Sequence, residues 1–94
     1  MNITAPDFVV VSAFRYALGR TTYIVEDTTI WLTENWYNIP QRTQELIHKE
    51  LSAAAKHDNE MRDNNQRQRT LGMDIDRRQW LKLLEFIKAE KEAS

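Results

Sequence analysis

Residues 76–90 read DRRQWLKLLEFIKAE, and the apolar positions in this stretch repeat at the three- and four-residue spacing of an α-helix. The stretch also begins with a capping box, in which Asp76 is the N-cap and Gln79 reaches back to it, while Ile75 can pack on Trp80 as a hydrophobic staple. One helix face then collects four large apolar side chains, Trp80, Leu83, Leu84 and Ile87. The pattern predicts a helix over about residues 76–91 that packs against other helices.

Two other segments carry the same kind of start signal. TAPD at residues 4–7 has Thr4 as an N-cap with Asp7 three residues later, and NIPQ at residues 38–41 has Asn38 as an N-cap with Gln41 in the matching position. Each segment has a proline in its first turn, where a missing N–H costs nothing. Three such starts in a chain with only two glycines and two prolines favour a helical protein.

The expected architecture is all-α, a small bundle of about four helices in a single domain spanning residues 1–94. A first helix over residues 5–18 is apolar on nearly every side, which predicts burial, and Gly19 is its expected left-handed C-terminal residue. A second helix follows within residues 21–37, with a short strand at residues 23–25 as the alternative. A third runs from about residue 39 to at least residue 55 and buries Leu46, Ile47, Leu51 and Ala54.

Residues 56–75 form a polar segment before the last helix. Met61 is the only apolar residue between positions 56 and 70, so this stretch has no face to bury. We interpret residues 56–75 as a polar arm, which is a solvated helix extension, a mobile loop, or both in sequence. The side chains of His57, Asp58 and Glu60 are expected to be solvated.

Charge and composition exclude several classes of protein. The net charge is −1, with −2 in residues 1–40 and +3 in residues 62–82, so the chain is not an all-over acidic DNA mimic. Cysteine is absent, which excludes disulfides and thiolate chemistry and is typical of a reducing compartment. No apolar run approaches the roughly 20 residues of a membrane span, and the N-terminus lacks the features of a secretory signal. No membrane association is expected.

The segment FRYALGRTTY, residues 14–23, mixes arginine and tyrosine with apolar residues at an expected helix corner. Arginine and tyrosine are enriched at protein interfaces, and WLTENWY at residues 31–37 adds further aromatic side chains. The predicted partner-binding residues are Arg15, Arg20, Tyr23, Trp31 and Tyr37. The structural alternative is that Arg15 pairs with Asp27 or Glu34 and that the aromatic side chains pack within the bundle.

The order of FRYALGR-TY, an ELIHKEL helix and a terminal LGMDIDRRQW resembles a group of small accessory proteins encoded by tailed phages and prophages. The resemblance covers most of the chain. It implies a phage protein that acts in the bacterial host cytoplasm and binds and inhibits, or redirects, a host protein complex in counter-defence or host takeover. The resemblance does not imply any catalytic residues in this sequence.

Two other functions remain open from the sequence. A nucleic-acid-binding or regulatory protein would use the arginines of the basic segment, Arg62, Arg67, Arg69, Arg77 and Arg78, to contact phosphates. An oligomeric sponge would instead grip a phosphorylated signal nucleotide with Arg15, Arg20 and Tyr23. A homo-oligomer is also compatible with the aromatic surface.

No catalytic or cofactor constellation is recognisable. His48 and His57, the two histidines of the chain, would lie on opposite faces of one helix and would not share a metal. The two glycines stand apart, so there is no phosphate-cradling loop. We therefore expect no enzymatic activity, no metal and no cofactor.

Overall fold

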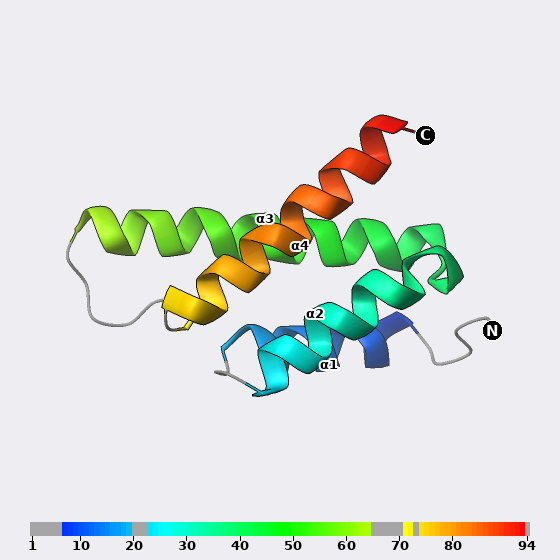
Figure 1. Cartoon of the computed structure of the whole chain (residues 1–94), viewed down its shortest axis with the longest axis horizontal. Coiled ribbons are helices and arrows are strands. Elements are labelled where there is room, and N and C mark those ends of the chain that lie inside the picture. The colour runs from blue at the N-terminus through cyan, green and yellow to red at the C-terminus, as the bar shows by residue number, and fades with distance from the viewer. Residues whose placement is uncertain (1–6, 20–22, 65–70, 73, 94) are drawn as a thin grey trace.

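The computed structural model describes residues 7–19, 23–64, 71–72 and 74–93, and in these ranges it contains four α-helices and no strand (Figure 1). The helices are α1 (Asp7–Leu18), α2 (Tyr23–Asn35), α3 (Gln41–Asp63) and α4 (Asp74–Ala93), with a 3-10 turn, η1 (Trp36–Asn38), between α2 and α3. The predicted all-α fold of four helices is confirmed. The alternative of a strand at residues 23–25 is wrong, because these residues form the first turn of α2, where Val25 is buried with Leu32 seven residues later.

The four helices pack in a ring, and Phe14 of α1 also reaches Trp80 of α4 across it. Helix α1 lies against α3, α3 crosses α4, α4 packs on α2, and α2 returns to α1 (Figure 1). The buried side chains come from all four helices, η1 and the residues that precede α3 and α4. The ring therefore encloses one core, consistent with a single small domain.

The core contains the apolar stripe expected in the last helix. Trp80, Leu83, Leu84 and Ile87 are all buried, and the Phe14 ring meets the Trp80 ring edge-on at 5.6 Å between centroids. Of the positions expected to be buried in α3, Ile47, Leu51 and Ala54 are buried and Leu46 is only half-buried.

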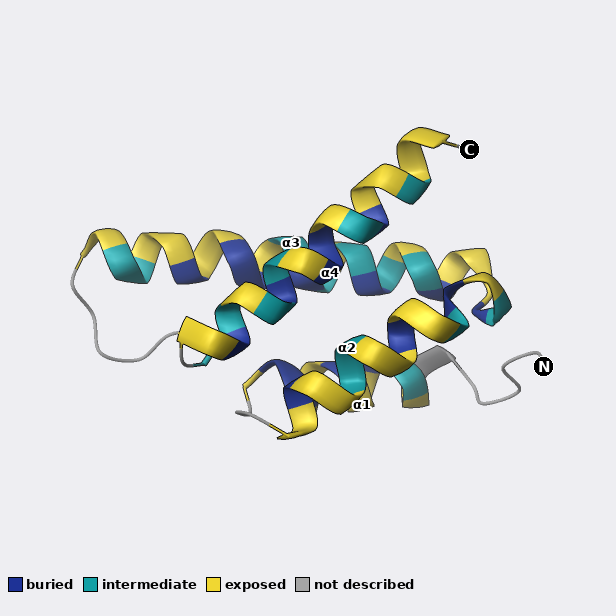
Figure 2. Cartoon of the chain, viewed as in Figure 1, coloured by how far each residue is buried: buried dark blue, intermediate teal, exposed yellow. Residues whose placement is uncertain are grey.

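The expectation that α1 is buried on every side is wrong. Phe14 and Leu18 face the core, whereas Val9, Ala13 and Tyr16 are exposed (Figure 2). Because α1 packs mainly on α2 and α3, one of its flanks has no helix of the described chain to cover it. An apolar flank of α1 is thus left at the surface.

Three helix ends differ from the sequence expectation. Pro40, not Asn38, occupies the N-cap position of α3, and Asn38 instead completes the 3-10 turn. Helix α4 begins two residues early, at Asp74, so that Asp76 is buried within its first turn and Ile75 is exposed rather than packed as a staple. The positive φ, 74°, belongs to Gly72 before α4 and not to Gly19, which adopts no left-handed conformation. The expected Thr4 cap lies outside the described residues.

The first part of the expected polar arm is helical, since α3 continues to Asp63. The 23 residues of α3 make it the longest element of the described chain, and its polar last turns extend past the part that packs on α1. Asp58 in this segment is completely buried, so the expectation that it is solvated is wrong. Residues 65–70 lie outside the described ranges.

Candidate functional site

A shallow groove of about 450 Å³ lies between α1 and α2. Its floor consists of the buried side chains of Phe14 and Leu32, and its rim consists of Val9 and Trp31, which are 45% and 43% exposed. The full lining is Val9, Val10, Ala13, Phe14, Asp27, Thr28, Trp31 and Leu32, so all of it except Asp27 and Thr28 is apolar or aromatic.

The groove follows from the helical register of its two walls. On α1, Val9, Ala13 and Tyr16 recur at four- and three-residue spacing, and all three are exposed. On α2, Ile24 and Trp31 are seven residues apart, which places them on one flank, and both are exposed. These apolar flanks lie on neighbouring helices and are left uncovered by the described part of the chain, which is typical of a site that binds another molecule.

The electrostatic character of the groove comes from α2. This helix contains Glu26, Asp27 and Glu34, all exposed, and no lysine or arginine. Asp27 lies one turn before Trp31 and Glu34 lies three residues after it, so acidic side chains flank the exposed indole along the helix. The groove is therefore apolar at its centre and acidic at Asp27 on its α2 edge, whereas Glu34 lines the neighbouring cleft between α2 and α4.

The positive charge of Arg15 does not neutralise the negative charge on this edge of the groove. Its guanidinium donates a 2.6 Å hydrogen bond to Glu50 of α3, on the opposite flank of α1 from the groove. This bond holds the pKa of the Glu50 carboxyl below its usual range and raises the pKa of Arg15. The alternative partners considered from the sequence, Asp27 and Glu34, are wrong because position 15 faces α3 and not α2.

The other predicted partner-binding residues are distributed around the bundle. Trp31 lines the groove, Tyr23 is exposed at the first residue of α2, and Arg20 lies outside the described residues. Tyr37 is 75% exposed and donates a hydrogen bond to Glu90 of α4. The structure does not bring Arg15, Trp31 and Tyr37 together on one surface. Val9 and Ala13 of the groove were missed, because an apolar helix contains no signal that distinguishes its covered flank from its exposed one.

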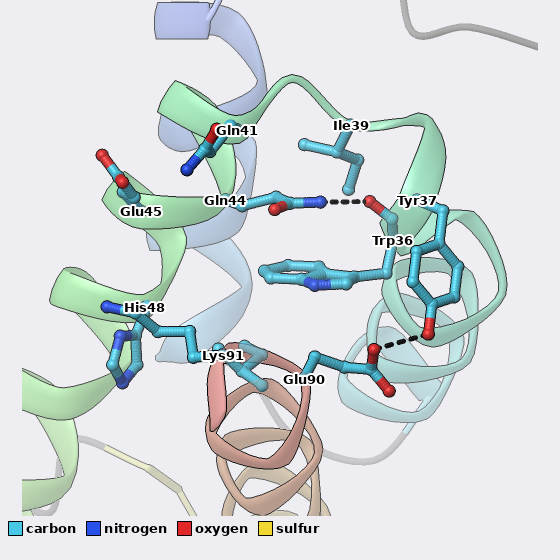
Figure 3. A pocket seen from close by; sticks show the side chains of 10 residues that line it. Trp36, Tyr37, Ile39, Gln41, Gln44, Glu45, His48, Glu90 and Lys91 are labelled. Carbon is cyan, nitrogen blue, oxygen red and sulfur yellow. Dashed lines mark hydrogen bonds between the residues drawn. The ribbon is translucent and has the colours of Figure 1, made fainter. Parts of the chain in front are cut away.

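A second cleft, of about 480 Å³, lies where η1 and the start of α3 meet the end of α4 (Figure 3). The Gln44 side chain donates a 2.6 Å hydrogen bond to the Trp36 carbonyl at one side, and the Tyr37–Glu90 bond closes the other. The rest of the lining is Ile39, Gln41, Glu45, His48, Ile87 and Lys91. The polar lining of this cleft combines amide, carboxylate and basic side chains. Among the described residues of the lining, no nucleophile is activated by a neighbouring base.

His48 in this second cleft predicts a pH dependence of stability. Partial burial, with the positive charges of Lys91 and Lys88, lowers its pKa below the ordinary value of 6.5. The folded chain therefore resists protonation of His48 more than the unfolded chain does, and its stability falls as the pH drops below about 6.5. We expect the melting temperature to decrease from pH 7 to pH 5 and the decrease to be smaller for His48→Gln. An equal decrease in the two proteins would contradict this assignment.

Two arginines of the basic segment, Arg62 and Arg77, form hydrogen bonds within the chain. The buried carboxylate of Asp58 accepts hydrogen bonds from Arg62 Nε at 3.0 Å and from Arg77 Nε at 2.7 Å. Arg62 also donates to Asp74 at 2.8 Å, and Arg77 donates to Asn59 at 2.9 Å. Arg78 is exposed, whereas Arg67 and Arg69 lie outside the described residues. Two of the five arginines considered for nucleic-acid binding thus tie α3 to α4, which leaves that function with less support.

Neither a metal centre nor a membrane segment is found in the described ranges. No three histidine, cysteine, aspartate or glutamate side chains there are grouped so as to hold a metal ion. Likewise, none of the described helices combines the length and apolar character that crossing a membrane requires. No protein-family model, curated protein or solved structure matches the chain.

Proposed function

We propose that the chain is a non-enzymatic protein that captures a partner protein in the α1–α2 groove. The observation that carries this proposal is the exposure of Trp31 beside Val9, at the rim of an apolar groove that no part of the described chain covers. A solvent-exposed tryptophan above an apolar floor has the composition of an interface hot spot. Burial of this surface by a partner would supply binding energy without any catalytic group.

The biological setting of the proposal is a phage-encoded protein acting in the bacterial host cytoplasm. Its support is the likeness of FRYALGR-TY and LGMDIDRRQW to small phage and prophage accessory proteins. A protein of this size that binds a host complex, in counter-defence or host takeover, would act by occupying a surface that the complex needs. Inhibition of that kind is steric, and it requires only affinity and an accessible surface.

Substitution of Trp31 by arginine tests the proposal. Because Trp31 is half-exposed, Trp31→Arg should leave the fold intact, while it removes the indole and places a charge in the apolar groove. We expect capture of host proteins by the purified chain to fall at least about tenfold, in line with loss of an interface hot spot. The measurement is pull-down from bacterial lysate with quantitative mass spectrometry, together with phage plating efficiency on bacteria that express each variant.

Ile75→Arg is the matched control, because Ile75 is 59% exposed on the first turn of α4 and does not line the groove. Circular dichroism of both variants establishes that they are folded. Capture that survives Trp31→Arg, or that Ile75→Arg impairs equally, would remove the groove as the binding site.

A further inference from the structure

Two features of the groove limit the chemistry of a partner that can bind there. The lining of the groove is apolar apart from Asp27 and Thr28, and Asp27 is exposed on α2 one turn before Trp31. Glu34 is also exposed on α2, three residues after Trp31, but it lines the neighbouring cleft between α2 and α4 together with Lys82. Helix α2 has no basic residue to balance Asp27, and Arg15 of α1 is paired with Glu50 on the far flank. A partner that fills the groove must bring its own positive charge to this edge, or Asp27 loses hydration without compensation.

The groove also favours a helical partner over an extended one. The described chain has no strand, so there is no sheet edge on which an extended peptide could add. The lining runs from Val9 to Phe14 on α1 and from Asp27 to Leu32 on α2, which is about 7 Å along each helix at 1.5 Å per residue. A helix lying along such a groove presents anchors at positions i, i+3 and i+4 over the same length.

A second copy of this chain is disfavoured as the occupant. Two grooves placed face to face would bring two acidic α2 walls into one interface, and neither copy supplies a lysine or arginine from the groove lining to balance Asp27. Like charges that meet across an interface cost binding energy, especially where water is excluded.

We infer that the α1–α2 groove binds an amphipathic helix of a partner protein whose apolar face is flanked by lysine or arginine. The inference depends on the proposed function, because it names the chemistry of the partner for the same groove. Opposite charges on the two surfaces also speed association, so the binding rate falls as salt rises.

A displayed peptide library tests this inference with the intact chain as the target. The library holds amphipathic helices of about 20 residues, long enough to be helical, with leucine on the apolar face and with lysine, glutamate or serine varied beside it. The selected peptides are then measured against wild type, Asp27→Lys with Glu34→Lys, and Trp31→Arg. Glu60→Lys with Glu92→Lys is the matched control, since it changes the net charge equally at exposed positions outside the groove.

We expect enrichment of lysine beside the apolar face, binding that weakens with salt, and an affinity loss of about tenfold or more for the Asp27→Lys, Glu34→Lys protein. The control protein should lose much less, and peptides with lysine changed to glutamate should regain affinity for the charge-reversed groove. Selected peptides that are neutral or acidic, but whose binding requires Trp31, would contradict the inference that the partner helix is basic. In that case the groove would still be a binding site. A selection that yields no Trp31-dependent peptide would overturn both. Self-association in sedimentation that Trp31→Arg abolishes would assign the groove to a second copy and also overturn the inference.

Discussion

Replacement of Trp80 by alanine should lower the free energy of unfolding by about 3–5 kcal/mol, which is the usual cost of removing a large aromatic side chain from a core. Trp80 is completely buried on α4 and meets the ring of Phe14 from α1 edge-on, so it joins helices from opposite ends of the sequence. Alanine would leave a cavity that the four-helix ring cannot close by moving one element. Because a small domain is stable by only about 5–15 kcal/mol, the variant should be close to unfolding at room temperature.

The matched control is the same substitution at the exposed position, Trp31→Ala, which should cost less than about 1 kcal/mol because Trp31 is half in solvent. Trp80→Phe should have an intermediate effect, since it keeps a ring against Phe14 and removes an indole N–H that lacks a hydrogen-bond partner among the described residues. Urea unfolding followed by circular dichroism measures all three variants. If Trp80→Ala and Trp31→Ala lower the free energy of unfolding equally, the burial of Trp80 in the core is contradicted.

Replacement of Asp58 by alanine should cost about 3 kcal/mol, although the residue lies in a polar stretch of sequence. Its carboxylate is completely buried and accepts hydrogen bonds from Arg62 of its own helix and Arg77 of α4. Alanine leaves both guanidinium groups without their shared counter-charge and removes the Arg77–Asp58 bond, one of the bonds that tie the end of α3 to the start of α4. Asp58→Asn keeps the volume but not the charge, so it should also destabilise the chain, though by less.

Asp63→Ala serves as the control for Asp58→Ala, because Asp63 lies five residues later on α3 and is exposed. Its loss should change the free energy of unfolding by less than about 0.5 kcal/mol. Chemical denaturation again gives the difference between the two variants. If Asp58→Ala is as stable as Asp63→Ala, the buried carboxylate contributes nothing to the joint between α3 and α4.

The candidate site could be predicted only in part. Trp31 stood out because interface-type residues are concentrated around it in the sequence. Its position opposite Val9 and Ala13 is set by the packing of α1 on α2, which no local spacing encodes. The same limit applies to Arg15, whose partner Glu50 is 35 residues away on a helix that the sequence does not place beside α1.

By itself, the sequence determined the all-helical class, the existence of four helices and the buried stripe from Trp80 to Ile87, because three- and four-residue periodicity and capping are properties of neighbouring residues. Only the tertiary structure decided which flank of α1 is covered, that Asp58 is a buried ion-pair centre, and that an apolar groove with an acidic edge remains open between α1 and α2. These features depend on which helices meet. An apolar or charged side chain has the same local pattern whether a neighbouring helix covers it or water does.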